Sequence, residues 1–140
     1  MEALLRELAQ NLQKQLGLHR ELLENLRREH AALLNADLRE IQEITYSKEI
    51  VLATLGQVER ERESWMQKLL DGRLLKSIPE TVTQVILAVQ GEFPSSAEAL
   101  RSTTQALRIL IDRIGKLNED NALLAKNSLQ HIERMKANVL

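Results

Sequence analysis

The residues best suited to acid–base chemistry or metal binding are three histidines, His19, His30 and His131. His19 and His30 fall on one face of a predicted helix, but eleven residues separate them, which is about 16 Å along the axis. They therefore cannot bind one metal ion. The carboxylates are scattered along helix surfaces near Lys or Arg, a pattern typical of solvated faces and i,i+4 ion pairs. We interpret His19 and His30 as partly exposed side chains and predict that the protein is not an enzyme.

The sequence lacks the short motifs that build phosphate, zinc or di-metal sites. It has no G-x-x-x-x-G-K-[ST] or G-x-G-x-x-G loop, no H-E-x-x-H, no Glu three residues before a His, and no cysteine. We therefore predict no cofactor and no metal site. An enzyme would need an active site built from residues that leave no motif.

Composition narrows the class of protein further. The chain has 140 residues, of which 44% are hydrophobic, 28% are charged and only 2% are aromatic. A net charge of -1 without a basic stripe argues against nucleic-acid binding. No apolar run approaches the roughly 18 residues of a membrane span, so we predict no membrane insertion. The first residues lack the pattern of a signal peptide, and the absence of cysteine fits a cytoplasmic protein.

Leucines spaced by three and four residues predict a first helix over about 2–34, with two histidines on the same seam. The seam, meaning the positions that face the bundle interior, comprises Leu5, Leu8, Leu12, Leu16, His19, Leu23, Leu26, His30 and Leu33. A break at 35–37 follows, and Asp37 with Glu40 is typical of an N-cap and its capping-box partner.

A regular heptad pattern predicts a second helix over about 38–71. Its seam comprises Ile41, Ile44, Lys48, Val51, Leu55, Val58, Arg62, Trp65 and Leu69. Gly72 is expected to end this helix at the C′ position. The short connection between the two helices indicates an antiparallel hairpin.

Prolines and glycines mark a connection over 73–95. Ser77, Pro79 and Glu80 predict the start of a short helix over about 79–90, and Gly91 and Pro94 predict a loop. A Ser95–Glu98 cap would then start a last helix over about 96–138. We predict a single all-α domain over 1–140, an antiparallel bundle of three long helices with a short helix in the connection.

The middle of the last helix is unusually small and polar. Its seam is Leu107, Ile111, Ile114, Asn118, Asn121, Ala125, Ser128, Ile132, Met135 and Val139, with Gly115 nearby. Asn and Gly inside a helix each cost roughly 0.5–1 kcal/mol relative to Ala. One interpretation is that a seam asparagine fixes helix register. The other is that this segment is a weakly committed helix whose groove accepts a partner.

Two stretches of the sequence resemble the FlgN family. "LNEDNALLAKNSL" is similar to the C-terminal signature of that family, in which two asparagines three apart follow a Leu and precede a Leu pair. The long N-terminal stretch "LGLHRELLENLRREHAALLNADLREIQEITYSKEIVLATL" also resembles the family, and together the two cover most of the chain. The signature residues here are Leu117, Asn118, Asn121, Leu124 and Ser128.

The resemblance implies a cytoplasmic type III export chaperone with a fold of long helices. Such proteins bind the C-terminal region of the two flagellar hook-filament junction (hook-associated) proteins, keep them unassembled and deliver them to the export gate. The resemblance also implies contacts with export apparatus components, but some members dock there through a tyrosine near the C-terminus, and this chain has none after Tyr46.

The last helix is therefore the predicted partner-binding element. To the signature residues we add Ile132 and Met135, which continue the same apolar seam. A partner helix would lie in a groove beside them. The alternative is a structural coiled-coil or oligomerisation module without a chaperone role, which explains the heptads equally well but gives no reason for the asparagines. The oligomeric state is left open.

Overall fold

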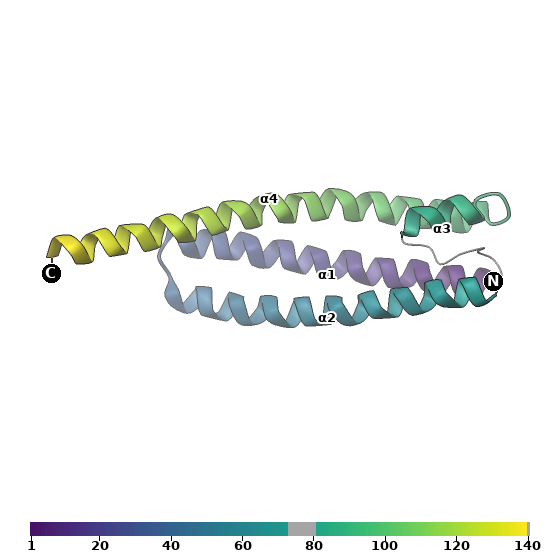
Figure 1. Cartoon of the computed structure of the whole chain (residues 1–140), viewed down its shortest axis with the longest axis horizontal. Coiled ribbons are helices and arrows are strands. Elements are labelled where there is room, and N and C mark those ends of the chain that lie inside the picture. Colours follow the sequence, from purple (N-terminus) through teal and green to yellow (C-terminus); the bar gives the residue numbers. More distant parts are fainter. Residues whose placement is uncertain (73–80, 140) are drawn as a thin grey trace.

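A computed structural model describes residues 1–72 and 81–139, and within these ranges the chain is helical with no strand. The four helices are α1 (Glu2–Leu34), α2 (Leu38–Asp71), α3 (Val82–Val89) and α4 (Pro94–Val139) (Figure 1). The prediction of an all-α fold with three long helices and one short helix is confirmed. The unbroken leucine and heptad patterns give the bounds of α1 and α2 as predicted.

The three long helices lie side by side, and α1 is the element that the other two share (Figure 1). Among the described residues, α1 packs against α2 and against α4, whereas the backbones of α2 and α4 do not approach each other closely. The pairing of α1 with α2 is antiparallel. Asn11, near the start of α1, donates a 2.9 Å hydrogen bond to the main-chain oxygen of Val58, near the end of α2.

The direction of α4 corrects the predicted arrangement. Gln13 of α1 donates to Thr103 (2.8 Å), and further along both helices the side chain of Asn121 donates to the main-chain oxygen of Leu26 (2.9 Å). Residue numbers therefore rise together along the two helices, which makes α4 parallel to α1. Helix α2 runs antiparallel to α1, but α4 does not, so the description as an antiparallel bundle does not hold for the α1–α4 pair.

The core follows the seam leucines of α1, which are buried over most of the helix. Its main cluster combines α1 with the end of α2, with α3 and with the first part of α4. On α1 the buried seam residues are Leu5, Leu8, Leu12, Leu16, Leu23 and Leu26. Each such side chain stabilises the fold by about 1.5–3 kcal/mol on burial. The two seam histidines and Leu33 are only partly buried.

The turn between α1 and α2 is a Schellman motif with alanine at the left-handed position. The main-chain N–H of Asp37 donates to Ala32 (2.9 Å) and that of Ala36 donates to Leu33 (3.3 Å). Ala36 has a φ of 52°, a conformation that usually favours glycine. Three residues thus join the two helices while pairing the main-chain oxygens of Ala31, Ala32 and Leu33 at the end of α1.

Asp37 also caps the start of α2, as predicted. Its side chain accepts a 3.1 Å hydrogen bond from the main-chain N–H of Glu40. The Glu40 side chain instead accepts from Arg28 of α1, an ion pair that ties the two helices together near the turn. At the other end of α2, Gly72 is the C-cap residue and not the predicted C′ residue. Its φ of -76° is an ordinary one, so this helix end does not use the left-handed conformation that glycine favours.

The connection differs from the prediction in detail. Helix α3 begins at Val82, with Thr81 as its N-cap, so it is shorter than the predicted 79–90. The proposed start signal, Ser77, Pro79 and Glu80, lies outside the described residues.

The predicted cap of the last helix is wrong. Helix α4 begins at Pro94, because proline at the first helical position gives up no hydrogen bond and has a suitable φ. The main-chain oxygen of Phe93 accepts the first helical bond from Ala97 (2.9 Å). Glu98 forms an ion pair with Arg101 and does not serve a Ser95 cap.

Candidate partner-binding site

Helix α4 extends beyond the end of the α1–α2 hairpin as a single helix (Figure 1). The hydrogen bonds of Asn121 place it beside the last two turns of α1, so α1 ends where α4 reaches about residue 125. Every side chain from 125 to 138 is exposed. We call residues 125–139 the overhang. At 1.5 Å per residue it extends about 20 Å beyond the hairpin.

The face of α4 that packs against α1 continues into the overhang without a change of phase. Residues on this face recur every three or four positions. We call them the α4 stripe, namely Leu117, Asn121, Leu124, Ser128, Ile132 and Met135. Leu117 and Leu124 are half-buried and Asn121 is buried, whereas Ser128, Ile132 and Met135 are exposed. The stripe therefore has a half that is covered by α1 and a half that nothing in the described chain covers.

The seven predicted partner-binding residues therefore do not form one exposed surface, because some are buried against α1 and others are exposed. Asn118 lies off the stripe and is exposed. Asn121 belongs to the interior of the protein, with only 2% of its surface exposed. Ile132 and Met135 are 48% and 52% exposed. An apolar side chain this exposed at regular spacing on one helix face is suited to contact another helix.

Asn121 anchors α4 to α1 at the point where the overhang begins. Its side-chain N–H groups donate to the main-chain oxygen of Leu26 (2.9 Å) and to Glu29 Oε1 (3.0 Å). Its Oδ1 accepts from Nδ1 of His30 (2.9 Å), so all of its polar atoms are bonded. A buried amide satisfied in this way favours one axial position of α4, because a shift would leave these groups without partners. Of the two interpretations of the asparagines, register control fits Asn121.

Glu29 connects this anchor to the third long helix. Its second oxygen, Oε2, accepts from Lys48 Nζ of α2 at 2.9 Å, and both side chains are largely shielded from solvent. Lys48 was expected in the seam, and the carboxylate of Glu29 explains how a lysine is tolerated there. One α1 carboxylate therefore bridges α2 and α4 close to the hairpin end.

Two leucines at the hairpin end are also exposed, although the sequence does not single them out. Leu34 is 64% exposed and Leu38 is 73% exposed, one on each side of the three-residue turn. We call residues 34–38 the hairpin tip. The sequence signal is a pair of leucines flanking Asn-Ala-Asp. These leucines point to a binding surface only because α4 runs beside the end of α1, and that packing cannot be predicted from the sequence alone.

Other parts of the molecule carry less distinctive surfaces. A groove of about 740 Å³ runs between the first halves of α1 and α4, lined mostly by small and polar side chains such as Ala9, Gln13, Ala99 and Ser102. The Nδ1 atom of His19 lies 2.7 Å from the main-chain oxygen of Gln15.

In residues 1–72 and 81–139, no three His, Cys, Asp or Glu side chains gather to hold a metal ion. Across the same part of the chain, no helix has the length and apolar character needed to span a membrane.

Comparison with known proteins identifies the family. No curated protein and no solved structure matches the chain. A family model described as "FlgN protein" matches residues 1–139. This match covers almost the whole chain, including the hairpin, the Asn121 anchor and the overhang. The chain therefore belongs to the FlgN family, which is a family of flagellar export chaperones and not of enzymes.

Proposed function

We propose that this protein is a cytoplasmic export chaperone for flagellar hook-associated (junction) proteins. It binds their C-terminal helical region, prevents premature assembly and delivers them to the type III export gate, where it contacts components of the export apparatus. Family membership supports the general role. The observation that supports the binding site is the exposed half of the α4 stripe, at Ile132 and Met135 on the overhang, where α4 has no neighbour in the described chain.

The overhang has the properties that a releasable binding surface needs. Because its side chains are already exposed, covering them with a partner helix removes apolar area from water without first breaking the core. Taking a fully exposed side chain of this kind to full burial is worth about 1.5–3 kcal/mol, so covering the exposed half of Ile132 or Met135 gains about half of that before the cost of association. Ile132, Met135 and Leu124 would therefore give the partner a few apolar contacts and a small interface. Such an interface is suited to binding that must later be reversed.

The alternative role, a structural coiled-coil or oligomerisation module, would use the same stripe to join two copies. The overhang is about as long as the shortest helices that are stable alone. A coiled coil confined to it would be short, and the bundle would gain little from it. The two roles differ in what covers Ile132 and Met135, so the same variants test both.

The decisive experiment replaces the two exposed stripe residues with serine, as Ile132→Ser and Met135→Ser together. Binding is measured by calorimetry against C-terminal segments of the hook-associated proteins from the same organism. We expect affinity to fall at least about tenfold, which corresponds to 1.4 kcal/mol. The matched control is Leu123→Ser, because Leu123 is also exposed on α4 but lies off the stripe. It should bind within about twofold of the unchanged protein.

Light scattering on the same samples separates the two roles. Unchanged affinity in the double variant would refute the site. A stable oligomer that ignores the segments, and that the double variant dissociates, would favour the structural module. Circular dichroism of each variant should be unchanged, because residues 132 and 135 contribute no burial to the bundle.

A further inference from the structure

The hairpin tip lies where a helix bound to the overhang would have its end. His30 contacts Asn121, and one turn later α1 reaches Leu34 while α4 reaches the start of the overhang. Leu34 follows His30 by four residues, so it lies on nearly the same face of α1, the face directed at α4. Leu38 starts α2 on the other side of the turn. The overhang and the hairpin tip therefore meet at a corner with exposed leucines on one wall and the α4 stripe on the other.

We propose that these two walls form one docking surface for a single amphipathic helix with acidic flanks. The helix lies along the overhang as a continuation of α1, with its end against Leu34 and Leu38. This inference rests on the proposed chaperone function and specifies the chemistry and the position of the partner segment.

The geometry of the α1–α4 pair supports a helix in this position. In the bundle, α1 covers the first half of the α4 stripe with leucines and with the carboxylate of Glu29, which bonds to Asn121. Helix α1 stops at Leu34, but the stripe continues in the same phase. A helix that continues the axis of α1 would meet Ile132 and Met135 as α1 meets Leu117 and Leu124.

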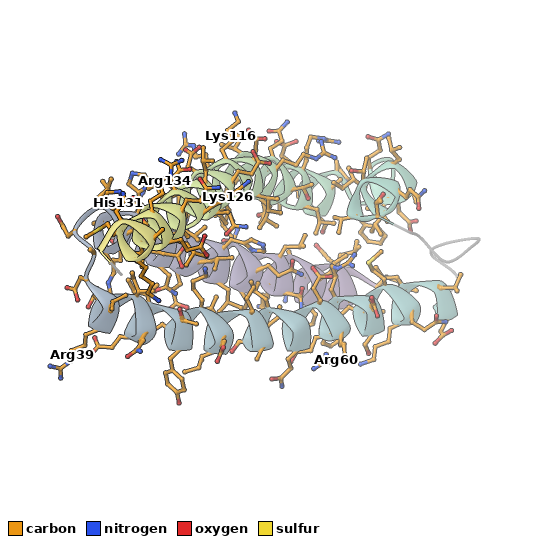
Figure 2. The ribbon with its side chains drawn as sticks, turned by 60° about the vertical axis from the view of Figure 1, so that its left-hand side comes forward. Arg39, Arg60, Lys116, Lys126, His131 and Arg134 are labelled. Carbon is orange, nitrogen blue, oxygen red and sulfur yellow. The ribbon has the colours of Figure 1, made fainter. Side chains whose placement is uncertain are left out.

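The charges of the overhang indicate the flanks of that helix. The overhang carries Lys126, Arg134 and Lys136 against a single acid, Glu133, and also contains His131. Figure 2 shows Lys126, His131 and Arg134 on the last part of α4, whereas Arg39 extends from the start of α2 on the side away from α4. None of the three Lys and Arg side chains of the overhang forms an ion pair within the described residues.

The positions of these charges around the helix axis favour carboxylates on the partner. At 100° per residue, Arg134 and Lys136 lie on the two sides of the stripe, flanking Met135, whereas Lys126 and Glu133 lie nearly opposite the stripe. A partner helix with Glu or Asp beside its apolar face would place them next to these cations. A second copy of the chain would instead bring the same cations together, which disfavours it as the occupant.

The charge part of the proposal is tested with two designed peptides that share one leucine stripe. One carries glutamate at the flanking positions and the other carries lysine. We expect the glutamate peptide to bind at least about tenfold more tightly than the lysine peptide at low salt, with the difference shrinking as salt is raised. The variant with Arg134→Glu and Lys136→Glu should lose or reverse this preference. Equal binding of both peptides, or tighter binding of the lysine peptide, would overturn the acidic partner.

The position of the helix is tested at the hairpin tip. Leu34→Ser with Leu38→Ser should weaken binding of the hook-associated segments and of the glutamate peptide at least about fivefold. Leu87→Ser is the control, because Leu87 is 62% exposed on α3, far from the tip.

The outcomes separate this inference from the proposed function. If the tip variants bind normally while Ile132→Ser with Met135→Ser does not, the composite surface is wrong and the chaperone site stands. If neither set affects binding of the segments, the proposed function fails at this site. A dimer in light scattering that excludes the peptides would replace the partner helix by a second copy and overturn the inference.

Discussion

The side chain of Asn121 donates a 2.9 Å hydrogen bond to the main-chain oxygen of Leu26, a residue 95 positions earlier in the chain. This contact sets how far α4 slides along α1, and hence how much of α4 extends past the hairpin. Moving α4 by one turn would change the overhang by about 5 Å. It would also leave the buried amide without its partners. A single polar side chain therefore determines both a packing register and the length of the exposed helix.

We expect Asn121→Ala to lower the free energy of unfolding by about 1–3 kcal/mol. The change removes hydrogen bonds to Leu26, Glu29 and His30 and leaves buried groups unpaired. Urea denaturation followed by circular dichroism measures the effect. The matched control is Asn118→Ala, three residues away and exposed, which should change the free energy of unfolding by less than about 0.5 kcal/mol. Equal effects of the two changes would show that Asn121 does not anchor the helix.

Gly115→Ala should stabilise the protein by about 0.5–1 kcal/mol. A Cβ at this position would meet no atom within 4 Å, and alanine is the better helix former. Since the exposed half of the α4 stripe already lies open, affinity for the hook-associated segments should not change. Thermal unfolding and calorimetry give the two numbers. A stabilised variant that binds more weakly would instead show that α4 must loosen before the partner enters.

Removing residues 130–140 should separate binding from folding. The side chains from 130 to 138 are exposed, so the truncated protein should keep its free energy of unfolding within about 0.5 kcal/mol. It loses Ile132 and Met135, and its affinity for the hook-associated segments should fall at least about tenfold. Urea denaturation of the truncated protein measures its free energy of unfolding, and calorimetry on the same preparation measures its affinity for the segments. Aggregation or loss of helicity without any partner would assign the overhang to the core.

Ala36→Gly should stabilise the turn between α1 and α2 by about 1 kcal/mol. At a φ of 52° alanine is strained, whereas glycine adopts the left-handed conformation without a Cβ clash. The control is Ala53→Gly at an exposed position inside α2, where the same change should destabilise by roughly 1 kcal/mol. Opposite signs in urea denaturation are the expected result. Destabilisation by both changes would contradict the strained turn.

The parts of the fold that could be predicted from sequence are those governed by local periodicity. Leucines and two histidines at spacings of three and four form one seam along α1, and this seam ends at the Asn-Ala-Asp turn, where Asp37 caps the next helix. Pro94 shows the limit of this reasoning. Proline is compatible both with a loop and with the first turn of a helix, and only the structure shows that it starts α4.

The candidate site depends on contacts between distant residues, so less of it could be predicted. Asn118 and Asn121 are the same residue type on one helix, but the three-residue separation turns Asn121 toward α1 and leaves Asn118 in solvent. The exposure of Ile132 and the presence of Leu34 beside the overhang both follow from the register of α4 on α1. That register is fixed by a buried hydrogen-bond network, which a heptad pattern alone does not specify.

The parallel pairing of α1 with α4 also determines an order of assembly. Contacts between α1 and α2 join residues as few as 12 apart, whereas those between α1 and α4 join residues 90 to 95 apart. Closing the longer loop costs more entropy, so the hairpin should form first and α4 should dock last. By the same reasoning, α4 is the unit expected to detach first in native-state hydrogen exchange. Its departure would uncover the leucine face of α1, a second surface of the kind that amphipathic helices recognise.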